Sequence, residues 1–186
     1  LSVQFGKRIL FDDVNVTFSG ANCYGIIGAN GAGKSTFLKI ISGQQEANSG
    51  SVHLEPGKRL SVLEQNHNAF DDYTVLDTVL RGNKELFKVK AEMDAIYAKE
   101  DFSDADGDRV GALQVVFEEM HGWNADSEAA TLLSHLEIPP TLHYNMMVDL
   151  DGVQKVRVLL AQALFGNPDV LIMDEPTNDL DYETIA

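Results

Sequence analysis

The residues with the clearest chemical pattern lie in the first quarter of the chain. They follow the spacing G-x-x-x-x-G-K-[ST], in the run Gly28-Ala29-Asn30-Gly31-Ala32-Gly33-Lys34-Ser35. Glycines let backbone N–H groups approach phosphate oxygens, because no Cβ stands in the way. Lys34 adds a positive charge, and the Ser35 hydroxyl is a ligand suited to Mg²⁺. The spacing therefore predicts a loop that binds the phosphates of a nucleoside triphosphate.

The flanks of this loop predict the elements that must position it. The apolar run 23–27 predicts a buried parallel strand, and residues 36–41 predict a helix ended by Gly43. A helix that starts at the loop favours anions at its N-terminus. The predicted nucleotide-binding residues are Phe5, Gly28, Asn30, Gly31, Ala32, Gly33, Lys34, Ser35 and Thr36.

A second chemical pattern lies near the end of the chain. The apolar run 170–173 predicts a strand, and Asp174 and Glu175 follow at its carboxyl end, where the ligands of parallel sheets collect. Asp174 suits the Mg²⁺ shell, and Glu175 suits orienting a water and accepting its proton. The pair predicts Mg²⁺-dependent hydrolysis of the β,γ-phosphate bond. The plainer alternative is a pair of surface carboxylates.

Composition narrows the class of protein. The 186 residues are 44% hydrophobic, enough for one core, and the net charge of −15 argues against a broad basic face for nucleic acid. No apolar run of about 18 residues predicts a membrane span, and no basic-then-apolar start predicts a signal peptide. The single cysteine, Cys23, lies in the predicted core strand, so we expect no internal disulfide and a cytoplasmic location. The histidines lack metal-ligand spacing, so Mg²⁺ is the one metal that we expect.

Alternating apolar residues in 1–19 predict antiparallel strands. Phe5, beside Gly6, suits stacking on adenine, and a core aromatic on a strand is an equal alternative. Runs 50–54 and 60–63 predict two more strands, with a turn at Pro56-Gly57.

From Thr74, a predicted helix cap, the apolar spacing becomes helical. Two apolar seams predict a helical hairpin at 84–121 with an acidic turn at 100–108. Three aspartates of this turn have the spacing of a calcium loop, but Val115 stands where the bidentate glutamate belongs, so we predict a solvated loop instead. Residues 126–136 predict a third helix, and Asp151 with Gln154 predicts the capped start of a last one.

Together these patterns predict an α/β protein. It has a P-loop NTPase core with a mixed or parallel sheet, an antiparallel β layer at the N-terminus and an inserted all-helical subdomain. We expect the core in 1–73 and 141–186, and the helical subdomain with its hairpin in 74–140.

The order of motifs resembles the nucleotide-binding domain of ABC ATPases. It consists of the phosphate loop, Gln65, the run Leu150-Asp151-Gly152-Val153-Gln154, and the run 171–181 with Asp174-Glu175-Pro176-Thr177-Asn178-Asp179-Leu180-Asp181. By this resemblance Phe5 stacks on adenine, Gln65 touches Mg²⁺ and senses the γ-phosphate, and Asp181 is the D-loop aspartate at the dimer seam. Asp151, Gly152, Val153 and Gln154 form the signature that caps ATP on the opposite domain. The implied partner is a second ABC domain, in the same chain or a second copy, that closes an ATP sandwich.

The signature departs from the usual L-S-G-G-Q at two positions. Asp151 replaces the serine and Val153 replaces the second glycine. The aspartate is a good N-cap, but its charge has the sign of the phosphate that it would face, and valine adds bulk where backbone should approach. We therefore expect a weakened cap on the partner's site.

Within the ABC group, the asparagine after D-E-P-T, Gly122-Trp123 and the run 158–168 resemble the ABC-F branch. The hairpin at 84–121 would be its arm. The resemblance implies the first half of a soluble two-domain ATPase that acts on ribosomes, cut before its switch histidine and inter-domain linker. Two alternatives stay open: a transporter ATPase that docks on membrane subunits, and a largely inactive nucleotide-gated scaffold.

Overall fold

The computed structural model describes residues 1–6 and 8–175, which form two compact units. The strand unit comprises Leu1–Leu63 and Pro168–Glu175, and the helical unit runs over Glu64–Asn167. The helical unit thus begins before residue 74 and includes the last helix among the described residues. The domain boundaries at 74 and 140 stay a prediction.

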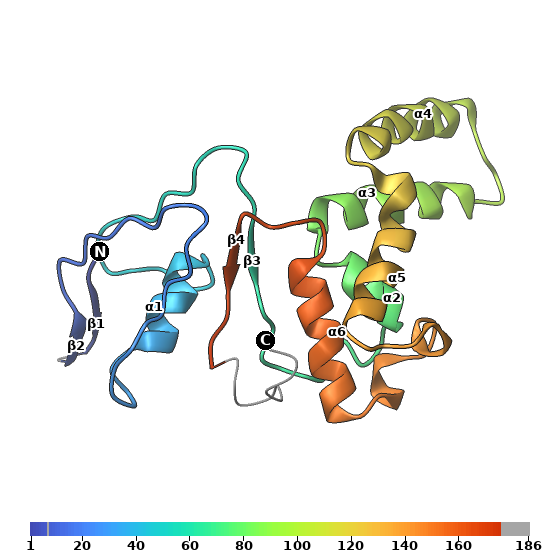
Figure 1. Ribbon diagram of the computed structural model, residues 1–186. Helices are drawn as coiled ribbons and strands as arrows, with labels where there is room; N and C mark the ends of the chain where they lie inside the picture. The colour runs from blue at the N-terminus through green and yellow to red at the C-terminus, as the bar shows by residue number, and fades with distance from the viewer. Residues whose placement is uncertain (7, 176–186) are drawn as a thin grey trace. The chain divides into compact units, whose positions relative to one another are not determined.

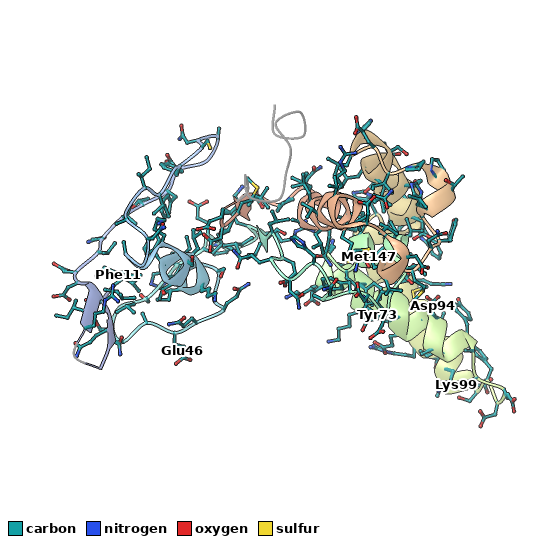
Figure 2. The ribbon with its side chains drawn as sticks, turned by 90° about the horizontal axis from the view of Figure 1, so that it is seen from below. Phe11, Glu46, Tyr73, Asp94, Lys99 and Met147 are labelled. Atoms are coloured by element: carbon teal, nitrogen blue, oxygen red, sulfur yellow. The ribbon has the colours of Figure 1, made fainter. Side chains whose placement is uncertain are left out.

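The strand unit contains an antiparallel pair at the N-terminus, as expected (Figure 1). β1 (Val3–Phe5) pairs with β2 (Arg8–Phe11), with an irregular register after Val3. Phe11 lies edge-on to Phe37 of α1 (Lys34–Ile41), with ring centroids 5.6 Å apart, and Figure 2 labels Phe11 beside this helix. The contact packs β2 against the helix that follows the phosphate loop.

A parallel pair of strands forms the second sheet of this unit, as the sequence predicted. β3 (Leu60–Val62) pairs with β4 (Val170–Ile172), and the Leu63 amide continues the ladder to the Ile172 carbonyl at 2.9 Å. Asp169, directly before β4, links the two strands at their start. Its carboxylate accepts hydrogen bonds from the Arg59 amide and from Lys58 Nζ, and these two residues directly precede β3. The hydrogen bond from Lys58 lowers the pKa of the Asp169 carboxyl from its ordinary value.

Several predicted strands of this unit are absent among the described residues. Residues 23–27 have no regular structure, Ile27 is 98% exposed and Cys23 is also exposed, so the prediction of a buried core strand is wrong. The strand predicted at 50–54 is also absent, and residues 14–18 form no strand. A parallel strand needs ladder partners and two covered faces, and the described part of the chain gives 23–27 neither.

The helical unit consists of five α-helices and short 3₁₀ turns within its described range (Figure 1). The α-helices are α2 (Val75–Leu80), α3 (Lys84–Tyr97), α4 (Asp104–Glu119), α5 (Ala125–His135) and α6 (Gly152–Leu164). The 3₁₀ turns are η1 (Gly122–Asn124), η2 (Pro140–Leu142) and η3 (Met147–Asp149). No helix among the described residues is long and apolar enough to cross a membrane.

One apolar cluster holds these helices together. Val79, Ala129, Leu133 and Val158 are fully buried in it, one or more from each of α2, α5 and α6. Gly82, two residues after the end of α2, lies so close to α6 that an added Cβ would be 1.9 Å from the Gln162 carbonyl oxygen. Gln162 reinforces the contact, because its side-chain amide donates to the Thr78 carbonyl at 3.0 Å.

The hairpin of α3 and α4 follows the predicted seams, with Met93 and Ile96 on one helix and Leu113 and Phe117 on the other buried. The predicted acidic turn at 100–108 is too long, however, because α4 already begins at Asp104. Ser103 caps it: its Oγ accepts from the Asp106 amide at 3.2 Å, and Asp106 Oδ2 accepts from the Ser103 amide at 3.0 Å. This capping box turns the acidic run into the first turns of a helix.

Candidate nucleotide-binding site

The phosphate loop leads into α1 through two glycines with left-handed backbone. Gly31 has φ 75° and Gly33 has φ 99°, backbone conformations that residues other than glycine rarely adopt. A Cβ at Gly33 would also lie 3.3 Å from Leu10 Cδ1 of β2. The glycine therefore lets the loop turn sharply against β2 and enter the helix.

Gly33 is the N-cap of α1 and offers no side-chain cap to the amides of the first turn. The first bond of the helix joins the Phe37 amide to the Gly33 carbonyl at 2.8 Å. The amides before it, of Lys34, Ser35 and Thr36, precede the helical ladder and carry the partial positive charge of the helix end. This end of α1 is suited to an anion such as a phosphate.

Lys34 folds back over the loop. Its Nζ donates to the Gly28 carbonyl at 2.9 Å and to the Ala29 carbonyl at 3.2 Å. Neutral carbonyls are weaker acceptors for an ammonium than phosphate oxygens, since charge-assisted bonds are roughly twice as strong. Lys34 is thus held at the loop by weak bonds, which stronger bonds to an arriving phosphate can replace.

Sequence analysis missed Arg8, which reaches the loop from β2. Its Nη2 donates to the Gly31 carbonyl at 2.8 Å. Arg8 therefore fixes the carbonyl of a loop glycine, and the Ala32 amide that follows it donates to the Ala29 carbonyl at 3.1 Å. A basic residue two positions before Leu10, the residue that contacts Gly33, was the available signal, but only the fold shows that β2 runs past the loop.

The acidic pair follows β4, as expected. Asp174 is half-buried and Glu175 is exposed, and both have interaction partners. Glu175 has φ 51°, a left-handed conformation that costs a non-glycine residue of order 1–3 kcal/mol. Five other described non-glycine residues also have a positive φ, so the role of Glu175 stays a prediction.

The signature residues lie at the start of α6 in the helical unit. Asp151 Oδ1 accepts from the Gln154 amide at 2.8 Å, and Gln154 Oε1 accepts from the Asp151 amide at 3.1 Å. The predicted capping box is therefore confirmed, and it engages the side chains of Asp151 and Gln154 with each other. Val153 is 50% exposed, and an added Cβ at Gly152 would meet nothing within 4 Å. These two residues give the start of α6 an open surface.

Three further predicted site residues are less defined. Gln65 is exposed in the helical unit, two residues after Leu63, and has an interaction partner. Phe5 ends β1. Asp181 lies outside the described residues. The roles of all three stay predictions.

The loop at the head of α1 and the acidic residues after β4 define a P-loop nucleotide-binding protein of the α/β class. Comparison with known proteins narrows this class. A family model described as ABC transporter matches residues 11–178, so the chain belongs to this family of ABC ATP-binding domains.

Relatives of the chain carry related descriptions. It is 57% identical over its whole length to the uncharacterized ABC transporter ATP-binding protein YkpA of Bacillus subtilis, and 49% identical to the probable ATP-binding protein YbiT of Escherichia coli O157:H7. It is 31% identical, over 97% of its length, to the energy-dependent translational throttle protein EttA of Mycobacterium tuberculosis. The chain spans only about a third of each relative, 34%, 35% and 32% of their lengths.

Solved structures support the fold. The chain resembles the dimeric ATP-binding cassette MJ0796 in a post-hydrolysis state bound to ADP and phosphate, with a TM-score of 0.64 and 22% identity. The likeness covers 98% of this chain and 74% of that one. A nucleotide-free cassette from an ABC transporter is similar at a TM-score of 0.61 and 24% identity, over 94% of this chain and 66% of the other.

Proposed function

We propose that this chain binds ATP on the phosphate loop and hydrolyses its β,γ-phosphate bond when a second ABC domain closes the site. The geometry at Gly33 and Lys34 carries the proposal, because it combines a sharp glycine turn, an uncapped helix start and a lysine held by weak acceptors.

The donor set suits Mg²⁺. Ser35 supplies a hydroxyl at the first turn of α1, and Asp174 supplies a carboxylate after β4. Such oxygen donors fit a hard cation that keeps several waters and binds through one or two carboxylates and the substrate phosphates. When bound there, Mg²⁺ would neutralise charge on the phosphate oxygens. We expect Gln65 to complete this ligand set.

The remaining steps belong to protein groups. The loop amides and Lys34 hold the phosphates and stabilise the charge that builds up as the bond breaks. Glu175 orients a water and accepts its proton. The signature residues of α6 cap the nucleotide of the partner domain, and Asp181 lies at the seam between the two domains.

We further propose that the complete protein is of the ABC-F type and acts at the ribosome in the cytoplasm. The likeness to EttA, whose name describes a translational throttle, supports this assignment. The asparagine after D-E-P-T in the sequence supports it as well. A transporter ATPase is the second candidate, since YkpA is named as a transporter ATP-binding protein.

The test uses the complete protein with Glu175→Gln, and the matching change in any second ATPase domain, so that ATP binds without turnover. Lysate with Mg²⁺ and ATP at physiological salt is then separated into ribosomes and membranes. We expect ATP-dependent recovery with ribosomes. A companion variant that also carries Lys34→Ala should lose this recovery, because it cannot hold the phosphates.

Other outcomes count against parts of the proposal. Recovery with membranes instead of ribosomes identifies a transporter ATPase and refutes the ABC-F assignment. A Glu175→Gln protein that hydrolyses ATP as fast as the unaltered protein refutes the role given to Glu175.

A further inference from the structure

Lys155 is a buried lysine at the start of α6. It comes directly after Gln154, and only 9% of its side chain is exposed. Its Nζ donates to Asp71 Oδ1 at 2.5 Å and to Asn68 Oδ1 at 2.8 Å. Both acceptors lie in the segment 66–73, far from Lys155 in the sequence but within the same helical unit.

This segment is a series of hydrogen-bonded turns that begins one residue after Gln65. The Asn66 amide donates to Glu64 Oε1 at 2.9 Å, and the Ala69 amide donates to the Asn66 carbonyl at 3.0 Å. The Tyr73 amide then donates to the Phe70 carbonyl at 2.9 Å. The segment therefore has little freedom to change shape by itself.

The far end of the segment is fixed to the stretch that leads into α6. The Met147 amide donates to the Tyr73 carbonyl at 2.9 Å, and the Val75 amide donates to the Asn145 carbonyl at 3.0 Å. Figure 2 shows Tyr73 and Met147 near each other in the helical unit. Lys155 adds a second link, from the residue that follows the signature to Asn68 and Asp71 within the segment.

A buried ammonium is a costly way to fill this place. Replacing a buried ion pair by apolar side chains of similar size is often neutral or stabilising, so core stability alone gives no reason for a lysine here. A paired lysine does supply fixed geometry, because its bonds to Asp71 and Asn68 form only in one arrangement of the two backbones.

We propose that Lys155 is a positioning residue for ATP hydrolysis. It ties the signature residues Asp151 to Gln154 to the segment 66–73, which directly follows Gln65, so that both stretches keep one arrangement within the helical unit. The connection is short: one peptide bond from Gln154 to Lys155, one hydrogen bond to Asn68, and three residues back to Gln65. This inference rests on the proposed function, since it assigns Lys155 a part in the same reaction.

The capping box does not replace this link. It keeps α6 helical through bonds between Asp151 and Gln154, but both partners lie on α6 or beside it. Without Lys155 the first turn of α6 stays formed but loses its side-chain bonds to the segment 66–73. Nucleotide binding on the phosphate loop does not depend on the pair, whereas closure over the nucleotide does.

The experiment uses the complete protein with Lys155→Met, which keeps the length of the side chain and removes its charge. Lys155→Arg tests rescue by a conservative change. The matched control is Lys90→Met, because Lys90 also pairs with an aspartate of the helical unit, Asp94 at 3.1 Å, but nearer the surface. Each protein is measured for affinity for a fluorescent ATP analogue, for kcat and KM, and for thermal melting.

For Lys155→Met we expect kcat to fall about tenfold, while affinity for the analogue stays within about twofold of the unaltered protein. Lys155→Arg should recover most of the lost turnover, and Lys90→Met should match the unaltered protein. Asp71→Asn should lower kcat as well, and combining it with Lys155→Met should cost little more than Lys155→Met alone, because the two side chains act as a pair.

An unchanged kcat in Lys155→Met overturns the inference. A fall in kcat also overturns the inference if nucleotide affinity and melting temperature fall with it. A purely structural role for Lys155 would give that result. If Lys155→Met does not fold, Asp71→Asn decides, and unaltered turnover in that variant overturns the inference. An unaltered protein that binds no ATP refutes the proposed function instead.

Discussion

At the scale of single residues, Gly33 determines whether the phosphate loop can take its shape. Two independent constraints act there, a left-handed backbone and the close approach of Leu10. The left-handed conformation costs a non-glycine residue roughly 1–2 kcal/mol in conformational energy. The steric contact with Leu10 comes on top of this cost.

We predict that Gly33→Ala weakens ATP binding at least tenfold, because about 1.4 kcal/mol already corresponds to a factor of ten. Fluorescence titration with an ATP analogue measures the loss. Gly20→Ala is the matched control, since an added Cβ there meets nothing within 4 Å and the backbone is not left-handed. Equal affinities of the two variants would contradict the importance given to the Gly33 backbone.

The altered signature leads to a second prediction at this scale. Restoring its usual residues with Asp151→Ser and Val153→Gly should raise ATP-driven domain association and turnover, because a negative charge and an exposed valine are removed. Serine is also a good N-cap, so α6 should remain capped. Unchanged association and turnover in the double variant would rule out a weakened cap. Asp151→Ser alone separates the effect of charge from that of bulk.

At the scale of elements, the helices were predictable where their signals are local. Thr74 as the cap of α2 and the Asp151–Gln154 capping box need only residues three apart in sequence, and both are present. The missed start of α4 carries the same signal at Ser103 and Asp106, which the acidic composition of the run obscured.

Strands and tertiary contacts depend on partners that are distant in the sequence, so local sequence patterns predict them less well than helices. The run 23–27 is apolar enough for a core strand, yet no described neighbour covers it. For the site, the loop pattern identified Gly33 and Lys34, but Arg8 and Lys155 act across 23 and more than 80 residues of sequence. No local spacing marks such contacts.

Two glycines of the helical unit give opposite predictions. Gly82→Ala should lower the free energy of unfolding by about 1–3 kcal/mol, because its Cβ would collide with the Gln162 carbonyl and force α2 and α6 apart. Gly111→Ala, in the middle of α4 with nothing within 4 Å, should raise it by about 0.5–1 kcal/mol through helix propensity. Urea denaturation measures both. Similar effects of the two substitutions would argue against the close approach of α2 and α6.

The hairpin turn should be sensitive to acid. Figure 2 shows Lys99 at the outer end of the hairpin, and its ammonium bonds to Asp106. This bond, with those from Ser103, lowers the pKa of Asp106 from 3.8 to about 2. Because the folded pKa is depressed, the stabilisation is complete above pH 3.8 and is lost as the pH falls through 2.

NMR titration of the Asp106 carboxyl checks this prediction. The α3–α4 turn should open as the carboxyl protonates, seen as faster amide exchange at Ser103. Asp106→Asn should make exchange at Ser103 fast at neutral pH as well. A carboxyl that titrates near 3.8 would show that the bonds to Lys99 and Ser103 do not form in solution.

At the scale of the whole molecule, the helical unit has an apolar core of its own. The apolar cluster of the helical unit and the side chains packed on it run from Phe70 to Phe165, all within Glu64–Asn167. We predict that a fragment of residues 64–167 folds alone and melts cooperatively, as followed by circular dichroism. Gly82→Ala should lower its melting temperature. A fragment without a cooperative transition would mean that this core needs the strand unit.

The pairing of β3 with β4 also has a consequence for biosynthesis. Arg59 and Asp169, which join the two strands at their start, are 110 residues apart. At about 5–20 residues per second, a ribosome needs several seconds or more to deliver β4 after β3 has emerged. During that interval β3 has an unpaired edge, which another extended segment can pair with in place of β4. If the helical unit folds first, the flexible chain between β3 and β4 becomes shorter. The entropic cost of bringing the two strands together is then smaller.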